Sequence, residues 1–209
     1  MKKSLKSYLK DIWRYPFKRF MKKNLKNESF SIISCNCIGG ILYHDLFQKF
    51  RSPTINLIIP NFIEFCENLN YYLNLTPVIK EKINNKFNWP EIYLDNIVIY
   101  GVHYNSSSEL KDKWIERSKR VNFKNIVIIA TDNFIKENQL ERFNNLNYPK
   151  VLFTSKKNLI YEWQVFLPEF SDKKEVGDTL RYTNIFGQRI FEKHFDCVGW
   201  LNESINYKS

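Results

Sequence analysis

Hydrophobic and polar residues between positions 29 and 155 follow two alternating patterns. Five short apolar runs, bounded by polar residues or glycine, are typical of buried strands: FSIIS (30–34), INLIIP (55–60), NIVIYGV (96–102), NIVIIAT (125–131) and KVLFTS (150–155). The segments between them place apolar residues three or four positions apart, which predicts helices over residues 41–50, 62–73, 106–121 and 134–145. A further helix is predicted over residues 184–194.

Strands that alternate with helices indicate an α/β fold. The chain has 209 residues, enough for one domain with its own hydrophobic core. We therefore predict a single Rossmann-like domain over residues 29–209, in which a mostly parallel sheet of about five strands lies between helices in three layers. Two helix starts have the spacing of a capping box, Asn61 with Glu64 and Ser106 with Glu109.

Residues 1–28 form a basic arm that precedes this domain. Residues 1–26 contain ten Lys or Arg and one Asp, so they carry +9 of the formal net charge of +10. Apolar residues recur there at helical spacing, opposite the cations, and Pro16 predicts a kinked helix or two short ones. Such a helix suits the surface of an anionic membrane, with residues 1–27 as the contact, or else its apolar face packs on the body of the protein. A third interpretation is that the arm contacts RNA.

The charge distribution also restricts the class of partner. Residues 27–209 contain 22 cations and 21 anions, so the remainder of the chain is nearly neutral. Proteins that bind nucleic acid usually spread basic residues over the domain, and we expect no specific nucleic-acid partner. No apolar run reaches the roughly 18 residues of a membrane-spanning helix, and the start lacks the apolar core of a secretory signal. We therefore expect a cytoplasmic protein whose arm is available for peripheral contact with the inner membrane face.

Polar residues that follow the predicted strands are candidates for a site, because open parallel sheets bind ligands outside the carboxyl ends of their strands. The residues at these positions are Ser34, Cys35, Asn36, Cys37, Gly39, Gly40, His103, Tyr104, Asn105, Thr131, Asp132, Thr154 and Ser155.

The sequence SCNCIGG over residues 34–40 has three interpretations. Cys37 at the start of a helix would be a nucleophile if His103 acted as its base. Free N–H groups of the same turn, beside Gly39 and Gly40, would instead hold phosphate, although the spacing differs from the known nucleotide-binding fingerprints. A tight turn from strand to helix also explains both glycines. The spacing of Cys35 and Cys37 fits neither a zinc site nor a redox pair.

Two further features concern catalysis and phosphate binding. His103, at the end of a predicted strand, is a candidate acid or base, or else a histidine bonded to the backbone. Lys113, Arg117 and Arg120 share a helix face that would hold a phosphate, or else form a solvated surface. The sequence has no Asp-x-Asp pair of the kind that holds a divalent ion in sugar transfer, and we expect neither a metal nor a cofactor.

Several motifs occur in the same order as in a known family. They are S-x-N-C-x-G-G over residues 34–40, SPTINL over 52–57, FIEFCENLNYYL over 62–73, His103 with Tyr104, and K-W-x-x-R-x-x-R-x-N over 113–122. In these motifs the chain resembles a bacterial family of unknown function whose members are often labelled exopolysaccharide or capsular polysaccharide biosynthesis proteins. The resemblance covers about residues 29–165 and leaves the basic arm outside it.

The resemblance implies a role in bacterial surface glycan synthesis and carries over no catalytic residues. Our first hypothesis is a glycosyltransferase-like or sugar-modifying enzyme that acts on a nucleotide sugar or a lipid-linked glycan without a metal. The candidate catalytic residues are His103, as base or phosphate contact, and Asp132, to orient the sugar. The candidate ligand-binding residues are Asn36, Cys37, Gly39, Gly40, Tyr104 and Arg117. The alternatives are a non-catalytic accessory protein of glycan assembly and an acyltransferase or hydrolase that uses Cys37 and His103.

Overall fold

A four-stranded parallel sheet forms the centre of the structure. The computed structural model describes residues 5–80 and 87–205, with side chains from residue 12 onward. Strands β1 (Ser31–Ser34), β4 (Ile126–Thr131), β5 (Lys150–Thr154) and β6 (Gln164–Phe166) lie in the order β1-β4-β5-β6, and each neighbouring pair is parallel. The predicted strands at 30–34, 125–131 and 150–155 are therefore confirmed. Strand β6 was not predicted, because three residues with one polar side chain give no clear apolar run.

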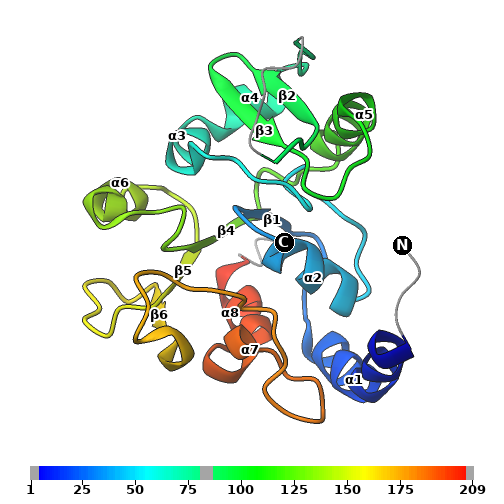
Figure 1. The fold of residues 1–209 in the computed structure, drawn as a ribbon, viewed down its shortest axis with the longest axis vertical. Helices are drawn as coiled ribbons and strands as arrows, with labels where there is room; N and C mark the ends of the chain where they lie inside the picture. Colours follow the sequence, from blue (N-terminus) through cyan, green and yellow to red (C-terminus); the bar gives the residue numbers. More distant parts are fainter. Residues whose placement is uncertain (1–4, 81–86, 206–209) are drawn as a thin grey trace.

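Helices cover both faces of this sheet, as the three-layer prediction requires (Figure 1). Successive residues of a strand point to opposite faces. Ile33, Ile128 and Leu152 accordingly belong to one hydrophobic cluster, and their strand neighbours belong to another. The first cluster includes residues of α3 (Phe62–Glu67), α4 (Leu69–Asn74), α5 (Ser107–Ser118) and α6 (Leu140–Asn144), and the second those of α2 (Ile38–Asp45), α7 (Ile190–His194) and α8 (Cys197–Ser204). The 3-10 helix η1 (Glu137–Gln139) precedes α6, and the 3-10 helix η2 (Pro168–Phe170) follows β6.

The predicted strand at 96–102 exists, but it lies outside the parallel sheet. Strand β3 (Ile97–Tyr100) pairs antiparallel with β2 (Glu91–Leu94) in a separate two-stranded sheet. With α3, α4 and α5 this hairpin forms the upper lobe in Figure 1. Apolar patterning identifies a strand but not its partner, and a short turn at Asp95, with φ of 54°, makes the adjacent strand the nearest partner.

The predicted strand over residues 55–60 is wrong. Only Ile58 in that run bridges to another strand residue, Tyr100. Asn56 has φ of 59°, which interrupts an extended backbone, and Pro60 has no N–H group to donate. Ile55, Leu57 and Ile59 of this run are buried nonetheless, so burial and not strand pairing explains the pattern.

The helix predictions hold in position but differ in extent. Residues 62–73 form two helices divided at Asn68, the helix over 134–145 shortens to η1 and α6, and the one over 184–194 shortens to α7. Ser106 caps α5 as predicted, because its side chain accepts a hydrogen bond from the Glu109 N–H at 3.1 Å. Asn61 makes no such bond.

Helix α1 (Leu5–Asn24) passes through Pro16 as one helix and not as two short ones. It packs against α2 and α8, its inner face buries Met21, and Leu25 directly after the helix is also buried. The cations Arg14 and Lys18 lie on the same inner face and are also buried. None of the described helices is long and apolar enough to cross a membrane.

A buried ion network fixes α1 to the body. The Arg14 guanidinium donates to Asp45 of α2 at 2.7 Å and to Glu192 of α7 at 2.9 Å, and Arg189 also pairs with Asp45. Lys18 Nζ lies 3.1 Å from Asp45 Oδ1. Burial alone raises the pKa of Asp45, but Arg189 and Arg14 lower it by more, so the net pKa lies well below its ordinary value. The arm is therefore attached to the domain by paired charges.

The outer face of α1 presents apolar side chains to solvent. Ile12, Trp13 and Phe20 have exposed fractions of 53%, 59% and 65%. Arg19 and Lys23 are exposed on the same helix. The apolar residues that the sequence predicts on one face of the helix are thus divided, since some face the body and others face solvent. The reason is that buried ion pairs, and not apolar contacts alone, set how the helix docks.

Candidate functional site

The carboxyl edge of the parallel sheet brings the first and fourth predicted strand ends together. β1 and β4 are neighbours, and the Thr131 hydroxyl lies 3.4 Å from Asn36 Nδ2 and 3.7 Å from Cys35 Sγ. Thr131 and Cys35 are buried, whereas Asn36 is half-buried. Burial raises the pKa of Cys35 to about 12, so this thiol stays protonated and acts as part of the core.

Cys37 and His103 meet where the upper lobe contacts the part of the molecule that contains the parallel sheet. Cys37 Sγ lies 3.9 Å from His103 Nε2, although 66 positions separate the two residues in the chain. His103 follows β3 in the hairpin lobe and is exposed, whereas Cys37 is half-buried just before α2. Burial raises the pKa of Cys37, and the nearby charge of Asp178 raises it further. The pair therefore combines a protonated thiol with a solvent-accessible imidazole.

The two glycines serve the packing of α2. A Cβ on Gly39 would lie 2.9 Å from Ser34 Cβ, and one on Gly40 would lie 3.2 Å from Asn56 Oδ1. The N–H of Ile38, in the first turn, is bonded to Asn36 Oδ1 at 3.0 Å. These contacts explain both glycines as a close strand-to-helix turn. Phosphate binding at this turn stays a prediction.

Asp132 connects three parts of the carboxyl edge. Its Oδ2 accepts hydrogen bonds from Thr154 Oγ1 at 3.0 Å and from the Ser155 N–H at 2.8 Å and hydroxyl at 3.1 Å. Its Oδ1 accepts a bond from the Val176 N–H at 2.8 Å. A carboxylate with four donors ties β4, β5 and residue 176 together. Its predicted role in orienting a sugar would act through the hydroxyl groups that it holds.

Tyr104 and Arg117 contact each other. Arg117 Nη1 donates to the Tyr104 hydroxyl oxygen at 2.6 Å, and that hydroxyl donates to the Ile55 carbonyl at 2.8 Å. The guanidinium also lies over the ring of Phe50. Burial raises the pKa of Tyr104. Both polar groups thus have protein partners, and their predicted ligand contact stays a prediction.

The neighbouring cations of α5 are also engaged. Lys113 Nζ lies 3.0 Å from Glu116 Oε2, and Arg120 pairs with the same carboxylate. Within the described residues, no group of three or more His, Cys, Asp or Glu is arranged to hold a metal ion.

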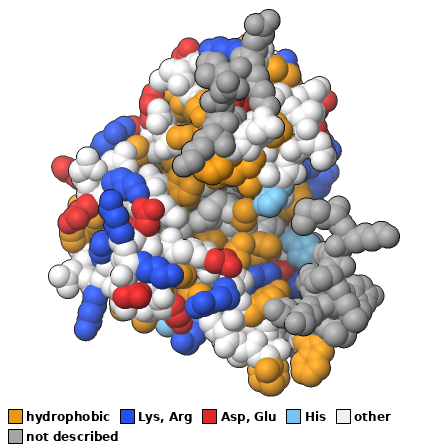
Figure 2. Space-filling model, in the orientation of Figure 1, with side chains coloured by type: hydrophobic (Ala, Val, Ile, Leu, Met, Phe, Trp, Pro, Cys, Tyr) orange, Lys and Arg blue, Asp and Glu red, His pale blue; other side chains and the backbone are white. Residues whose placement is uncertain are grey.

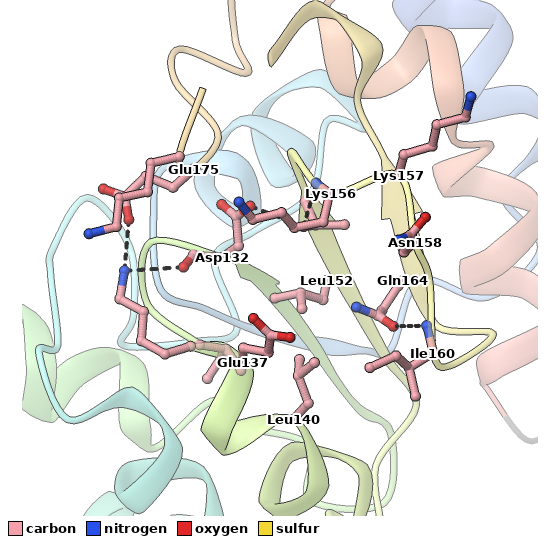
Figure 3. Close-up of a pocket in the computed structure, with 14 residues that line it drawn as sticks. Asp132, Glu137, Leu140, Leu152, Lys156, Lys157, Asn158, Ile160, Gln164 and Glu175 are labelled. Carbon is pink, nitrogen blue, oxygen red and sulfur yellow. Dashed lines mark hydrogen bonds and ion pairs between the residues drawn. The ribbon is translucent and has the colours of Figure 1, made fainter. Parts of the chain in front are cut away.

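A cavity of about 450 Å³ opens at the same edge, beside Asp132 (Figure 3). Its floor is apolar and contains Ile135, Leu140 and Leu152. Polar side chains from η1, from residues 156–158, from the start of β6 and from residues 174–175 surround this floor. Figure 2 shows charged side chains of both signs interleaved on the side of the molecule where α6 and β6 lie in Figure 1.

Sequence reasoning missed every residue of this cavity except Asp132 and Thr154. The missed polar residues are Lys136, Glu137, Lys156, Lys157, Asn158, Gln164, Lys174 and Glu175. One signal was present, since the polar run SKKN directly follows the apolar run of β5. Gln164 gave no signal, because its strand was not predicted.

One segment connects the cavity with the Cys37–His103 pair. Glu175 lines the cavity, the Val176 N–H binds Asp132, and the charge of Asp178 acts on Cys37. Residues 175–178 therefore run from the cavity toward Cys37, whereas neither Cys37 nor His103 lines the cavity itself. An exposed imidazole next to the turn that follows β1 can serve acid–base chemistry on a small molecule.

Comparison with known proteins identifies relatives over nearly the whole chain. The model of the family described as "Domain of unknown function (DUF1919)" matches residues 8–202. A protein of Haemophilus influenzae (strain Rd), described as "Uncharacterized protein", is 30% identical over 206 residues, which cover 96% of this chain and 97% of that protein. The family match begins within α1, so it extends beyond the predicted resemblance over residues 29–165 and takes in most of the basic arm.

Proposed function

The chain belongs to the DUF1919 family, and from this premise we propose that it is a metal-independent enzyme that transfers or modifies a sugar in bacterial surface polysaccharide synthesis. The observation that carries the proposal is the exposed imidazole of His103 at the carboxyl edge of the parallel sheet, next to Cys37. Ligands of α/β folds bind at this edge. The motifs that resemble exopolysaccharide biosynthesis proteins support the setting, and the absence of an Asp-x-Asp pair supports a mechanism without a metal.

In the proposed reaction His103 is the general base. Its imidazole takes the proton from an acceptor hydroxyl while the hydroxyl oxygen bonds to the anomeric carbon of the donor. The bond between that carbon and the donor phosphate oxygen breaks, and the phosphate leaves with the electron pair. Asp132 contributes by holding the hydroxyl groups of Thr154 and Ser155 in place.

The direct test is His103→Ala, assayed with a panel of nucleotide sugars that are first ranked by thermal shift. Removing a general base is expected to lower turnover by about 10²- to 10⁴-fold. The unfolding midpoint should not move, because the side chain is exposed. Wild-type turnover that survives in His103→Ala would exclude this base. No turnover by the wild type with any donor would favour the non-catalytic accessory protein.

We place the enzyme at the inner face of the cytoplasmic membrane, with α1 as the contact. The outer face of α1 exposes Trp13 and Phe20 beside the cations Arg19 and Lys23, a combination that suits an anionic interface. Each cation near such a surface contributes about 1 kcal/mol. Deleting the arm would be a poor test, because it would also remove Arg14 from the buried network.

Point substitutions test the membrane contact without disturbing that network. Trp13→Gln combined with Phe20→Gln should weaken co-sedimentation with vesicles that contain phosphatidylglycerol. Phe123→Gln replaces an aromatic residue of similar exposure outside α1 and should have no effect. Equal binding by all three proteins, or equal binding to neutral vesicles, would contradict the contact.

One observation favours a second function, acyl transfer or hydrolysis by Cys37 with His103. The distance of 3.9 Å between Cys37 Sγ and His103 Nε2 permits proton transfer after a small adjustment. Cys37→Ser separates the two functions. Turnover that survives this change supports the sugar enzyme, whereas turnover that disappears without loss of stability supports the thiol nucleophile.

A further inference from the structure

The cavity beside Asp132 has the size and the lining of a small-molecule site. Its volume of about 450 Å³ lies in the range of pockets that hold small ligands. Leu140 and Leu152 form a buried apolar floor, and Ile160 covers part of one side with an exposed fraction of 65%. A ring with one apolar face and polar groups around its edge would match this arrangement.

Gln164 presents an unpaired donor to this cavity although the residue is only 7% exposed. Its Oε1 accepts hydrogen bonds from the N–H groups of Ile160 at 2.8 Å and Tyr161 at 2.9 Å. Two donors on the oxygen fix the orientation of the amide, so its NH₂ group must face the other way. Figure 3 shows that nitrogen pointing into the cavity, and no partner for it is found in the described part of the chain. The nitrogen is open to the cavity, so an acceptor on a bound ligand can take its hydrogen bond.

The charged residues of the cavity divide into paired and unpaired groups. Lys136 bonds to Glu175 at 2.7 Å and to the Asp132 carbonyl at 3.2 Å. The carboxylate of Glu137 points into the cavity (Figure 3) and has no ion-pair partner among the described residues. Lys156 reaches over the cavity from the end of β5, also without an ion-pair partner in the described ranges, whereas Lys157 points away from it (Figure 3).

We infer that this cavity is the sugar subsite of the protein and that it binds a hexopyranose that carries a phosphate. The Gln164 amide donates to one ring hydroxyl, and Glu137 accepts from another. The phosphate lies toward Lys156, and the apolar face of the ring lies on Leu140 and Leu152. This inference rests on the proposed function, because it names the substrate class of the same edge. It assigns ligand contacts to Gln164, Glu137 and Lys156, which were not among the residues predicted from the sequence.

Binding of hexose phosphates, measured by calorimetry on the full chain, tests the subsite without any assay of turnover. The probes are glucose 1-phosphate and galactose 1-phosphate, compared with the free hexoses and with inorganic phosphate. Gln164→Glu keeps the acceptor oxygen that holds residues 160–161 and removes the donor, and it should weaken the sugar phosphate about tenfold or more. Lys156→Gln should weaken the sugar phosphate to a similar degree and leave a free hexose unchanged.

Lys157→Gln is the matched control, since Lys157 follows Lys156 in the sequence, has the same charge and points away from the cavity. It should bind like the wild type. Three outcomes would overturn the inference: no binding of either sugar phosphate at millimolar concentration, equal affinity for inorganic phosphate, or affinity unchanged in both Gln164→Glu and Lys156→Gln. His103→Ala should bind the sugar phosphate normally. The two proposals can therefore fail separately. A wild type that binds the sugar phosphate but shows no turnover contradicts the enzyme and leaves the subsite in place.

Discussion

Two polar regions of this protein contain similar residue types but differ in whether their polar groups have partners within the protein. The network around Arg14 and Asp45 buries its charges, and each of them is paired with an opposite charge. At the cavity, by contrast, the side chains of Glu137 and Lys156 have no ion-pair partner within the described residues, and the NH₂ group of Gln164 has no hydrogen-bond partner there. Saturated groups hold elements together, whereas groups left unsatisfied in a cavity are available to a ligand. The presence or absence of a partner thus distinguishes charges that stabilise the fold from charges that can bind a ligand. The residue types alone do not make this distinction.

Breaking the buried network should have the largest effect on stability. Arg14→Met leaves Asp45 and Glu192 buried with fewer cations, and we expect the free energy of unfolding to fall by about 3–5 kcal/mol. Urea unfolding measures this change. Arg19→Met, on the exposed face of the same helix, should change stability by no more than about 0.5 kcal/mol. Equal effects of the two substitutions would show that the network does not hold α1.

Two carboxylates at the carboxyl edge allow the same comparison within a short distance. Asp132→Asn replaces an acceptor of four hydrogen bonds by an amide that must place its own donor among them. We expect a loss of about 2–3 kcal/mol in unfolding free energy. Glu137→Gln should be neutral within about 0.5 kcal/mol. If Glu137→Gln destabilised the protein as much as Asp132→Asn, the distinction between them would fail.

Acid should weaken the network through Asp45. Since the folded pKa of Asp45 lies below the ordinary value of about 3.9, the unfolded chain binds the proton more readily. Its contribution to stability is therefore complete above about pH 5 and is lost as the pH falls below about 4. Urea midpoints of the wild type and Asp45→Asn, measured from about pH 6 down to about pH 3, should converge as the pH falls. A constant difference over that range would contradict the lowered pKa.

The smallest expected effect concerns the reactivity of Cys37. Because burial and the charge of Asp178 raise its pKa, alkylation by iodoacetamide should be slow at neutral pH and should still increase above about pH 8.5. Mass spectrometry of the modified protein measures the rate at Cys37, since the other three cysteines are buried. His103→Ala should leave the profile nearly unchanged. A rate that levels off near neutral pH would indicate a thiolate–imidazolium pair and favour the acyl-transfer function.

Strands, helices and caps could be predicted from the sequence where neighbouring residues alone decide the structure. The runs of β1, β4 and β5 are apolar on both faces, and this pattern predicts a parallel strand covered by helices. The Ser106 cap followed from its spacing to Glu109. The strand at 55–60 failed because a positive φ at Asn56 leaves no trace in hydrophobicity.

Patterns within the sequence were enough to predict strands β1, β4 and β5, the helices on both faces and the concentration of charge in α1, because periodicity and composition are local properties. Three outcomes needed the folded structure: Cys37 meets His103 across 66 positions, Arg14 faces inward while Trp13 faces solvent, and the NH₂ group of Gln164 faces a cavity. These outcomes depend on which distant elements pack together. Burial and pairing are properties of the assembled surfaces, and the same residue types become structural or available according to what lies opposite them.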